Sequence, residues 1–111
     1  MQKSVVQLGG GGTYVLASVY RVNGSASKST LAFKGGPKEV LTSISRYQAG
    51  RYVINHNIRT NDYLAVVAQS ALPNCSVLIP SNTTDLSLIM SNAAGVNVDD
   101  SCILMIYTWK N

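Results

Sequence analysis

The sequence predicts an all-β protein of one domain, with antiparallel strands arranged as a β-sandwich or a barrel. The chain has 111 residues, which is about the size of a single domain. Apolar and polar residues alternate with a period of two over much of the chain, which is the spacing of strands rather than helices. Turn-forming residues interrupt these segments at short, regular intervals, as in sandwiches and barrels.

About eight or nine strands follow from this pattern. The first clear strand covers residues 13–22, is rich in aromatic and β-branched residues, and ends at the turn pair Asn23-Gly24. Residues 63–68 form a nearly continuous apolar run, which predicts a central strand buried on both faces. The other predicted strands cover residues 29–33, 39–47, 51–58, 75–79, 86–90 and 102–109, and 102–109 is also expected to be buried.

The connections between these strands carry the expected turn residues. Gln48-Ala49-Gly50 predicts a tight hairpin turn, and residues 59–62 and 92–100 are expected to be loops. Residues 1–12 include a run of four glycines and are expected to form a flexible N-terminal arm or linker. Residues 13–111 would then be the sandwich domain.

The composition limits the classes of partner. Charged residues make up 13% of the chain, against roughly 25% in an average soluble domain. Small polar groups must therefore cover much of the surface, or part of the surface is buried in an oligomer. The net charge is +4, but the basic residues are scattered singly, which argues against nucleic acid. No run of 18 apolar residues occurs, so we expect no membrane insertion.

The sequence lacks the patterns of common catalytic sites. His56 is the only histidine, and we interpret it as a packed or surface residue, with an ion site on a trimer axis as the alternative. Asp99 and Asp100 are adjacent, so on an extended chain their carboxylates point apart, which is poor geometry for acid–base catalysis. We interpret them as a turn before the last strand, with a calcium site as the alternative. We therefore expect no enzyme activity, no cofactor and no metal.

Cys75 and Cys102 are the only cysteines. No disulfide framework pattern surrounds them, and a chain made in a cytosol rarely keeps a disulfide. We interpret both as small strand residues, with pairing as the alternative.

Binding of a neutral polar ligand such as a glycan is the function for which the sequence supplies suitable groups. Tyrosine and tryptophan combine an apolar ring with a polar group, and binding residues often lie on loops that a rigid scaffold holds. Tyr63 and Trp109 are assigned instead to the core or to a subunit interface. The candidate ligand-binding residues are Tyr47, Asn57, Arg59, Asn61, Asp62, Asn92, Asn97 and Asp99.

Residues 40–68 resemble a run that recurs in the C-terminal heads of bacteriophage tail fibres. Gly50 and Tyr52, within QAGRYVINHNI, match the G-x-Y element of these heads, and Asp62-Tyr63, within NDYLAVVAQ, matches the "nY" pair that follows. The segments ASVYRVNGSAS and DDSCILMI resemble the opening and closing strands of the heads. The likeness covers about two-thirds of the chain, and its motifs are short.

This resemblance implies a jelly-roll-like sandwich on the surface of a virion, made in the cytoplasm of a bacterial host. It implies a homotrimer that attaches to a glycan or protein of the host surface. Because about a dozen residues precede the first clear strand, where tail-fibre heads follow a long shaft, the chain would be an excised head or a short free-standing virion protein.

Two alternatives stay open, namely a capsid decoration or head-fibre protein that contacts other virion proteins, and a small carbohydrate-binding lectin. The low charge favours an oligomer independently of the resemblance, because closed symmetry buries surplus apolar surface and covers sheet edges.

Overall fold

The computed structural model describes residues 5–7, 12–60, 62–70, 74–78 and 83–110. These residues form nine antiparallel strands, and none of them forms a helix that could span a membrane. The strands are β1 (Val5–Gln7), β2 (Thr13–Asn23), β3 (Thr30–Gly35), β4 (Leu41–Gln48), β5 (Arg51–His56), β6 (Tyr63–Ser70), β7 (Asn74–Leu78), β8 (Asp85–Ser91) and β9 (Ser101–Lys110).

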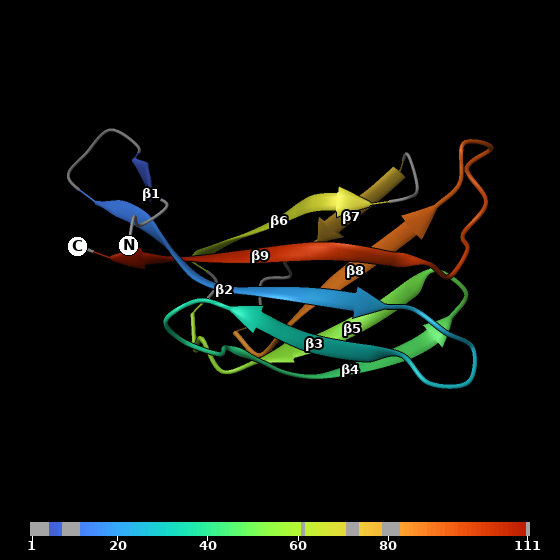
Figure 1. Ribbon diagram of the computed structural model, residues 1–111, viewed down its shortest axis with the longest axis horizontal. Helices are drawn as coiled ribbons and strands as arrows, with labels where there is room; N and C mark the ends of the chain where they lie inside the picture. The colour runs from blue at the N-terminus through green and yellow to red at the C-terminus, as the bar shows by residue number, and fades with distance from the viewer. Residues whose placement is uncertain (1–4, 8–11, 61, 71–73, 79–82, 111) are drawn as a thin grey trace.

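The strands form two sheets that pack face to face, with β2 and β9 crossing the front of the molecule in Figure 1. In sheet A, β9 lies between β2 and β6, while β1 and β3 pair with the first and last parts of β2. Sheet B has the order β4-β5-β8-β7. The chain passes from one sheet to the other four times, after β3, β5, β6 and β8. The predicted antiparallel β-sandwich is therefore confirmed.

The period of two in the sequence places one apolar series of each long strand between the sheets. In β8, alternate residues are fully buried, namely Leu86, Leu88 and Met90. Burial of such a side chain stabilises the fold by roughly 1.5–3 kcal/mol. The buried hydrophobic cluster consists of Ala17, Tyr20, Val22, Val40, Leu41, Tyr52, Ile54, Tyr63, Leu86, Leu88, Met90, Cys102, Leu104 and Ile106.

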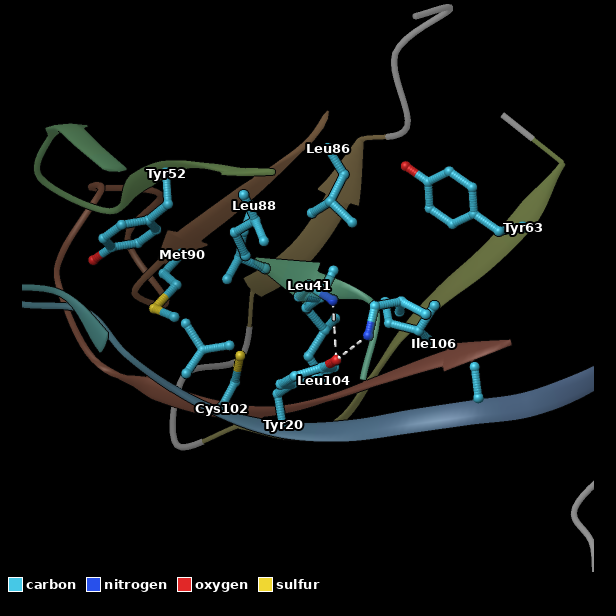
Figure 2. Close-up of a cluster of buried hydrophobic side chains, with 14 residues drawn as sticks. Tyr20, Leu41, Tyr52, Tyr63, Leu86, Leu88, Met90, Cys102, Leu104 and Ile106 are labelled. Atoms are coloured by element: carbon cyan, nitrogen blue, oxygen red, sulfur yellow. Dashed lines mark hydrogen bonds between the residues drawn. The ribbon is translucent and has the colours of Figure 1, made fainter. Parts of the chain in front are cut away.

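Tyr20 ties the two sheets together by hydrogen bonds as well as by packing (Figure 2). Its side chain reaches from β2 in sheet A to the start of β4 in sheet B. There its hydroxyl oxygen accepts hydrogen bonds from the backbone N–H groups of Val40, at 2.7 Å, and Leu41, at 3.0 Å. Because these amides are buried, the hydroxyl gives them the partners that water would otherwise supply.

The hairpin turn predicted at Gln48-Ala49-Gly50 is confirmed between β4 and β5. Gly50 has φ of +70°, in the left-handed region that glycine adopts without steric cost. A Cβ at Gly50 would lie 2.3 Å from the carbonyl oxygen of Met90. This position therefore requires glycine both for its dihedral angle and for the close approach of the β8 backbone.

The structure corrects two predicted strands. Residues 63–68 belong to β6, which lies at the edge of sheet A among the described residues, next to β9, and leaves Val66 43% exposed, so they are not buried on both faces. The strand predicted at 51–58 ends at His56, because the next amides leave the ladder: the N–H of Asn57 donates to the Val40 carbonyl and that of Ile58 to His56 Nδ1.

The predicted arm contains a strand that the sequence pattern does not indicate. Val5–Gln7 form β1 and pair with residues 13–15 of β2. The rest of the arm, residues 1–4 and 8–11, lies outside the described residues.

Candidate functional site

The predicted ligand-binding residues do not form one site, because they lie at opposite ends of the sandwich. Asn92, Asn97 and Asp99 lie in the β8–β9 connection, beside the β4–β5 turn. The β5–β6 connection lies at the other end, beside the start of β2 and the last part of β9 (Figure 1). It carries Asn57, Arg59 and Asp62, while Asn61 lies outside the described residues.

Asp99 is committed to a network inside the fold. Its carboxylate accepts hydrogen bonds from Arg46 Nε at 3.1 Å and from the Gly50 N–H at 3.0 Å, and it forms an ion pair with Arg46 Nη2 at 3.0 Å. The hydroxyl of Tyr52 also donates to it. One carboxylate thus joins β4, the hairpin turn, β5 and the β8–β9 connection.

The ionisation of this network fits a structural role. The hydrogen bonds from Arg46 lower the pKa of Asp99 to about 2, since they favour the charged carboxylate. Burial and the hydrogen bond to Asp99 raise the pKa of Tyr52, because both oppose a phenolate. At neutral pH the network is therefore an anionic carboxylate held by a guanidinium cation and a neutral phenol.

Asn92 and Asn97 shape the β8–β9 connection. Asn92 Oδ1 accepts hydrogen bonds from the N–H groups of Ala94, at 3.0 Å, and Val96, at 3.1 Å. Asn97 Oδ1 accepts from the Ser91 hydroxyl at 2.7 Å. These are the local side-chain contacts by which asparagine stabilises turns.

At the opposite end, Asp62 holds an aromatic pair. Its carboxylate accepts a hydrogen bond from the Tyr14 hydroxyl at 2.5 Å, and the ring of Tyr14 makes an edge contact with Trp109, with 5.0 Å between the centroids. Asn57 and Arg59 are exposed in the neighbouring connection. Arg59 has φ of +65°, a conformation that is uncommon for residues other than glycine.

The outer face of sheet B is polar and carries the exposed Tyr47. The guanidinium of Arg51 lies 5.6 Å from the centre of the Tyr47 ring, so the two side chains form a cation–π pair. The Asn55 amide donates to the Ser43 hydroxyl at 2.9 Å. We call this surface the polar face; its outward residues are Ser43, Ser45, Tyr47, Arg51, Val53, Asn55, Asn74, Ser76, Asp85, Ser87 and Ile89.

The outer face of sheet A carries a cluster of apolar side chains. Its side chains stand in cross-strand rows, because the register places Leu16 and Leu64 on either side of Tyr107, and Val19 and Val66 on either side of Met105. Most of these side chains are half-buried, and Val66 is exposed. We call this surface the apolar face; its residues are Leu16, Val19, Leu64, Val66, Ile103, Met105 and Tyr107.

Within the described ranges, the titratable side chains do not converge on one catalytic site. His56 is only 7% exposed, and its Nδ1 accepts a hydrogen bond from the Ile58 N–H, so it is a packed residue as predicted. Burial lowers its pKa. It is the last residue of β5, whereas Asp99 and Asp100 lie at the opposite end of the sandwich, the hairpin end, which carries the β4–β5 turn. In the described part of the chain, no group of three metal-ligating side chains lies close enough to hold an ion.

The sequence prediction missed two features of these surfaces. Arg51 directly follows the hairpin turn, and its pairing with Tyr47 depends on an irregular register between Arg46 and Gln48. The apolar face was missed because 102–109 was expected to be a buried strand. The outward residues of this strand, which include Ile103, Met105 and Tyr107, are as apolar as its inward residues. This pattern in the sequence could have indicated an apolar outer face.

No protein-family model, no curated protein and no solved structure matches this chain.

Proposed function

We propose that this protein is a receptor-binding domain on the surface of a bacteriophage virion, a homotrimer without enzyme activity that attaches to a host-surface glycan. The observation that carries the proposal is the contrast between the two outer faces of the sandwich. The apolar face of sheet A serves assembly, and the polar face of sheet B serves attachment. The likeness of residues 40–68 to tail-fibre heads supports the virion location and the number of subunits.

The chemistry of the apolar face supports assembly with copies of the same chain. Met105 lies at its centre, flanked in register by Val19 and Val66. Arg21 is exposed on the same side of β2 and lies opposite Ile103, at one end of the rows. A cluster of neighbouring apolar side chains that is partly open to solvent is typical of a protein interface. Because the seven residues that define the face are uncharged, copies can meet on them while Arg21 stays at the edge of the contact, in water.

The chemistry of the polar face supports a neutral, hydroxyl-rich ligand. Tyr47 offers an aromatic ring that is 55% exposed, next to the guanidinium of Arg51. Serine hydroxyls and asparagine amides cover the strands around this pair and can both donate and accept hydrogen bonds. Sugar rings need an apolar surface to stack on and polar groups for their hydroxyls, and this face provides both.

The proposal is tested by probing an array of bacterial surface polysaccharides with the purified protein. Ser87 lies within the polar face, opposite Val53 in register, so Ser87→Glu places a charge where the ligand would lie. We expect the wild type to bind at least one polysaccharide, and the variant to lose at least tenfold in affinity while keeping its mass in solution. Equal binding of polysaccharide by the wild type and the variant would exclude the polar face as the binding surface.

The same experiment separates the alternatives. A monomer that binds polysaccharide would be a simple lectin. A protein that binds no polysaccharide would contradict the proposal and favour a decoration protein or a domain that binds a host protein.

A further inference from the structure

The two cysteines lie on facing strands of opposite sheets. Cys75 is on β7 of sheet B, opposite Met90 in register, and Cys102 is on β9 of sheet A, opposite Val22. Because Met90 and Val22 are fully buried and neighbours in register share a face, both cysteines point into the space between the sheets. Figure 2 shows the sulfur of Cys102 directed from β9 toward sheet B.

The two thiol groups are in contact across this space. Their side chains form a hydrogen bond with each other, and neither cysteine is part of a disulfide bond in the structure. Cys102 is 3% exposed, whereas Cys75 is partly exposed and packs against the buried cluster. This contact places the two sulfur atoms next to each other, and a disulfide bond would bring them to a separation of about 2.05 Å.

We propose that Cys75 and Cys102 form a disulfide bond between the two sheets when the folded protein meets a low-molecular-weight disulfide such as oxidised glutathione. The bond joins the edge strand β7 of sheet B to β9, which lies inside sheet A. It encloses β8 and the β8–β9 connection in a covalent loop.

The reaction is a pair of thiol–disulfide exchanges. Cys75, the more exposed thiol, loses its proton to solvent and attacks one sulfur of oxidised glutathione, and a glutathione thiolate leaves. The thiolate of Cys102 then attacks the Cys75 sulfur of this mixed disulfide, and a second glutathione thiolate leaves. The two cysteines are oxidised by two electrons in total, and oxidised glutathione is reduced to two glutathione molecules.

The surroundings of Cys102 set the order of these steps. The hydrogen bond with Cys75 and burial raise the pKa of the Cys102 thiol, so little of it is a thiolate at neutral pH. Cys75 is therefore the thiol that attacks oxidised glutathione. Because β7 is an edge strand of sheet B in the part of the chain that the structure describes, its local opening can admit the reagent while the rest of the core stays packed.

The experiment uses the intact protein under native conditions. After equilibration with oxidised glutathione and trapping of the remaining thiols with a maleimide, intact mass spectrometry should show a loss of about 2 Da and no maleimide. Peptide mapping should find Cys75 linked to Cys102 within one chain. We expect the oxidised protein to melt roughly 10 °C higher than the reduced protein, because the bond restricts the unfolded chain.

Two variants serve as controls. Cys102→Ala should accumulate a glutathione adduct of about 305 Da on Cys75 and show no rise in melting temperature. Cys75→Ser leaves the buried Cys102 in place and should react with neither reagent while folded. Two free thiols in the wild type after equilibration, or glutathione adducts or chain-to-chain bonds in place of the internal bond, would overturn the proposal.

Discussion

The two outer faces of the sandwich are built from the same alternating pattern but differ in chemistry. On sheet A, the central strand β9 turns Ile103, Met105 and Tyr107 outward. On sheet B, the central strands turn serine, asparagine and arginine outward, with Val53 and Ile89 as the apolar exceptions. Inside the molecule the two sheets contribute alike to one buried cluster.

The difference between the two faces suggests that the residues that stabilise the fold are not the ones that mediate association. A strand needs only one apolar face to form the core of a sandwich. The outward apolar series of β9 therefore adds more apolar surface than the fold requires, and the proposed partner is what covers it. The polar face carries no such surplus and stays in contact with solvent.

The largest expected effect comes from a charge placed on the apolar face. Met105→Glu should dissociate the oligomer into single chains at micromolar concentration, because an unpaired carboxylate buried in an interface costs about 3–5 kcal/mol. Ser87→Glu, the matched change on the polar face, should leave the mass unchanged. Light scattering measures both, and equal effects of the two variants would remove the distinction between the faces.

The contact between the sheets should depend on the Tyr20 hydroxyl. Tyr20→Phe leaves the buried amides of Val40 and Leu41 without their acceptor, so we expect a loss of roughly 2–3 kcal/mol in the free energy of unfolding. Tyr47→Phe removes an exposed hydroxyl and should change this free energy by less than about 0.5 kcal/mol. Urea titration compares the two, and a small effect at both positions would contradict the role of Tyr20.

Acid should weaken the Asp99 network. Its pKa is about 2 in the folded protein against an ordinary value of 3.8, so the folded state binds the proton less readily than the unfolded chain. The stabilisation is fully present above about pH 4 and is lost as the pH falls toward 2, amounting to about 1–2 kcal/mol.

The variant Asp99→Asn separates this contribution from that of other carboxylates. Its deficit in unfolding free energy relative to the wild type should be present at pH 7 and shrink between pH 4 and pH 2. A deficit that stays constant over this range would show that the carboxylate charge is not what stabilises the hairpin end.

The smallest effect on the fold is expected at Tyr47 itself. Because its side chain is 55% exposed and sits on the polar face, Tyr47→Ala should change the melting temperature by no more than about 2 °C. It should keep the oligomer while weakening polysaccharide binding. Thermal unfolding and light scattering check the first two points, and a large drop in melting temperature would assign Tyr47 to the fold instead.

The sequence pattern predicts the local features of this fold well and its long-range pairings poorly. The period of two and the Gly50 turn are local, and both are found in the structure. The edge position of β6 depends on strands distant in sequence, and so does the pairing of β2 with β9. The sequence predicts Asp99 as a ligand contact because it lies in a loop, and it does not indicate the ion pair with Arg46, since Arg46 lies on a strand far from Asp99 in the sequence.

The candidate binding residues show the same contrast between what the local sequence indicates and what the folded chain determines. Tyr47 is exposed, as a binding residue must be, because the sequence places it at the end of a strand next to a tight turn. Asn92 and Asn97 were expected to bind because they are polar and lie in a loop, yet the loop itself uses their side-chain oxygens. Polarity in a loop therefore does not distinguish a ligand contact from a turn contact.

We propose that copies of this chain meet on the apolar face of sheet A. The most direct test of this interface is the mass of the wild-type protein in solution, measured by light scattering at micromolar concentration. We predict a mass about three times the 11.9 kDa of one chain, which falls to that of one chain in Met105→Glu. A wild-type protein that stays monomeric at that concentration would contradict the proposed interface on the apolar face.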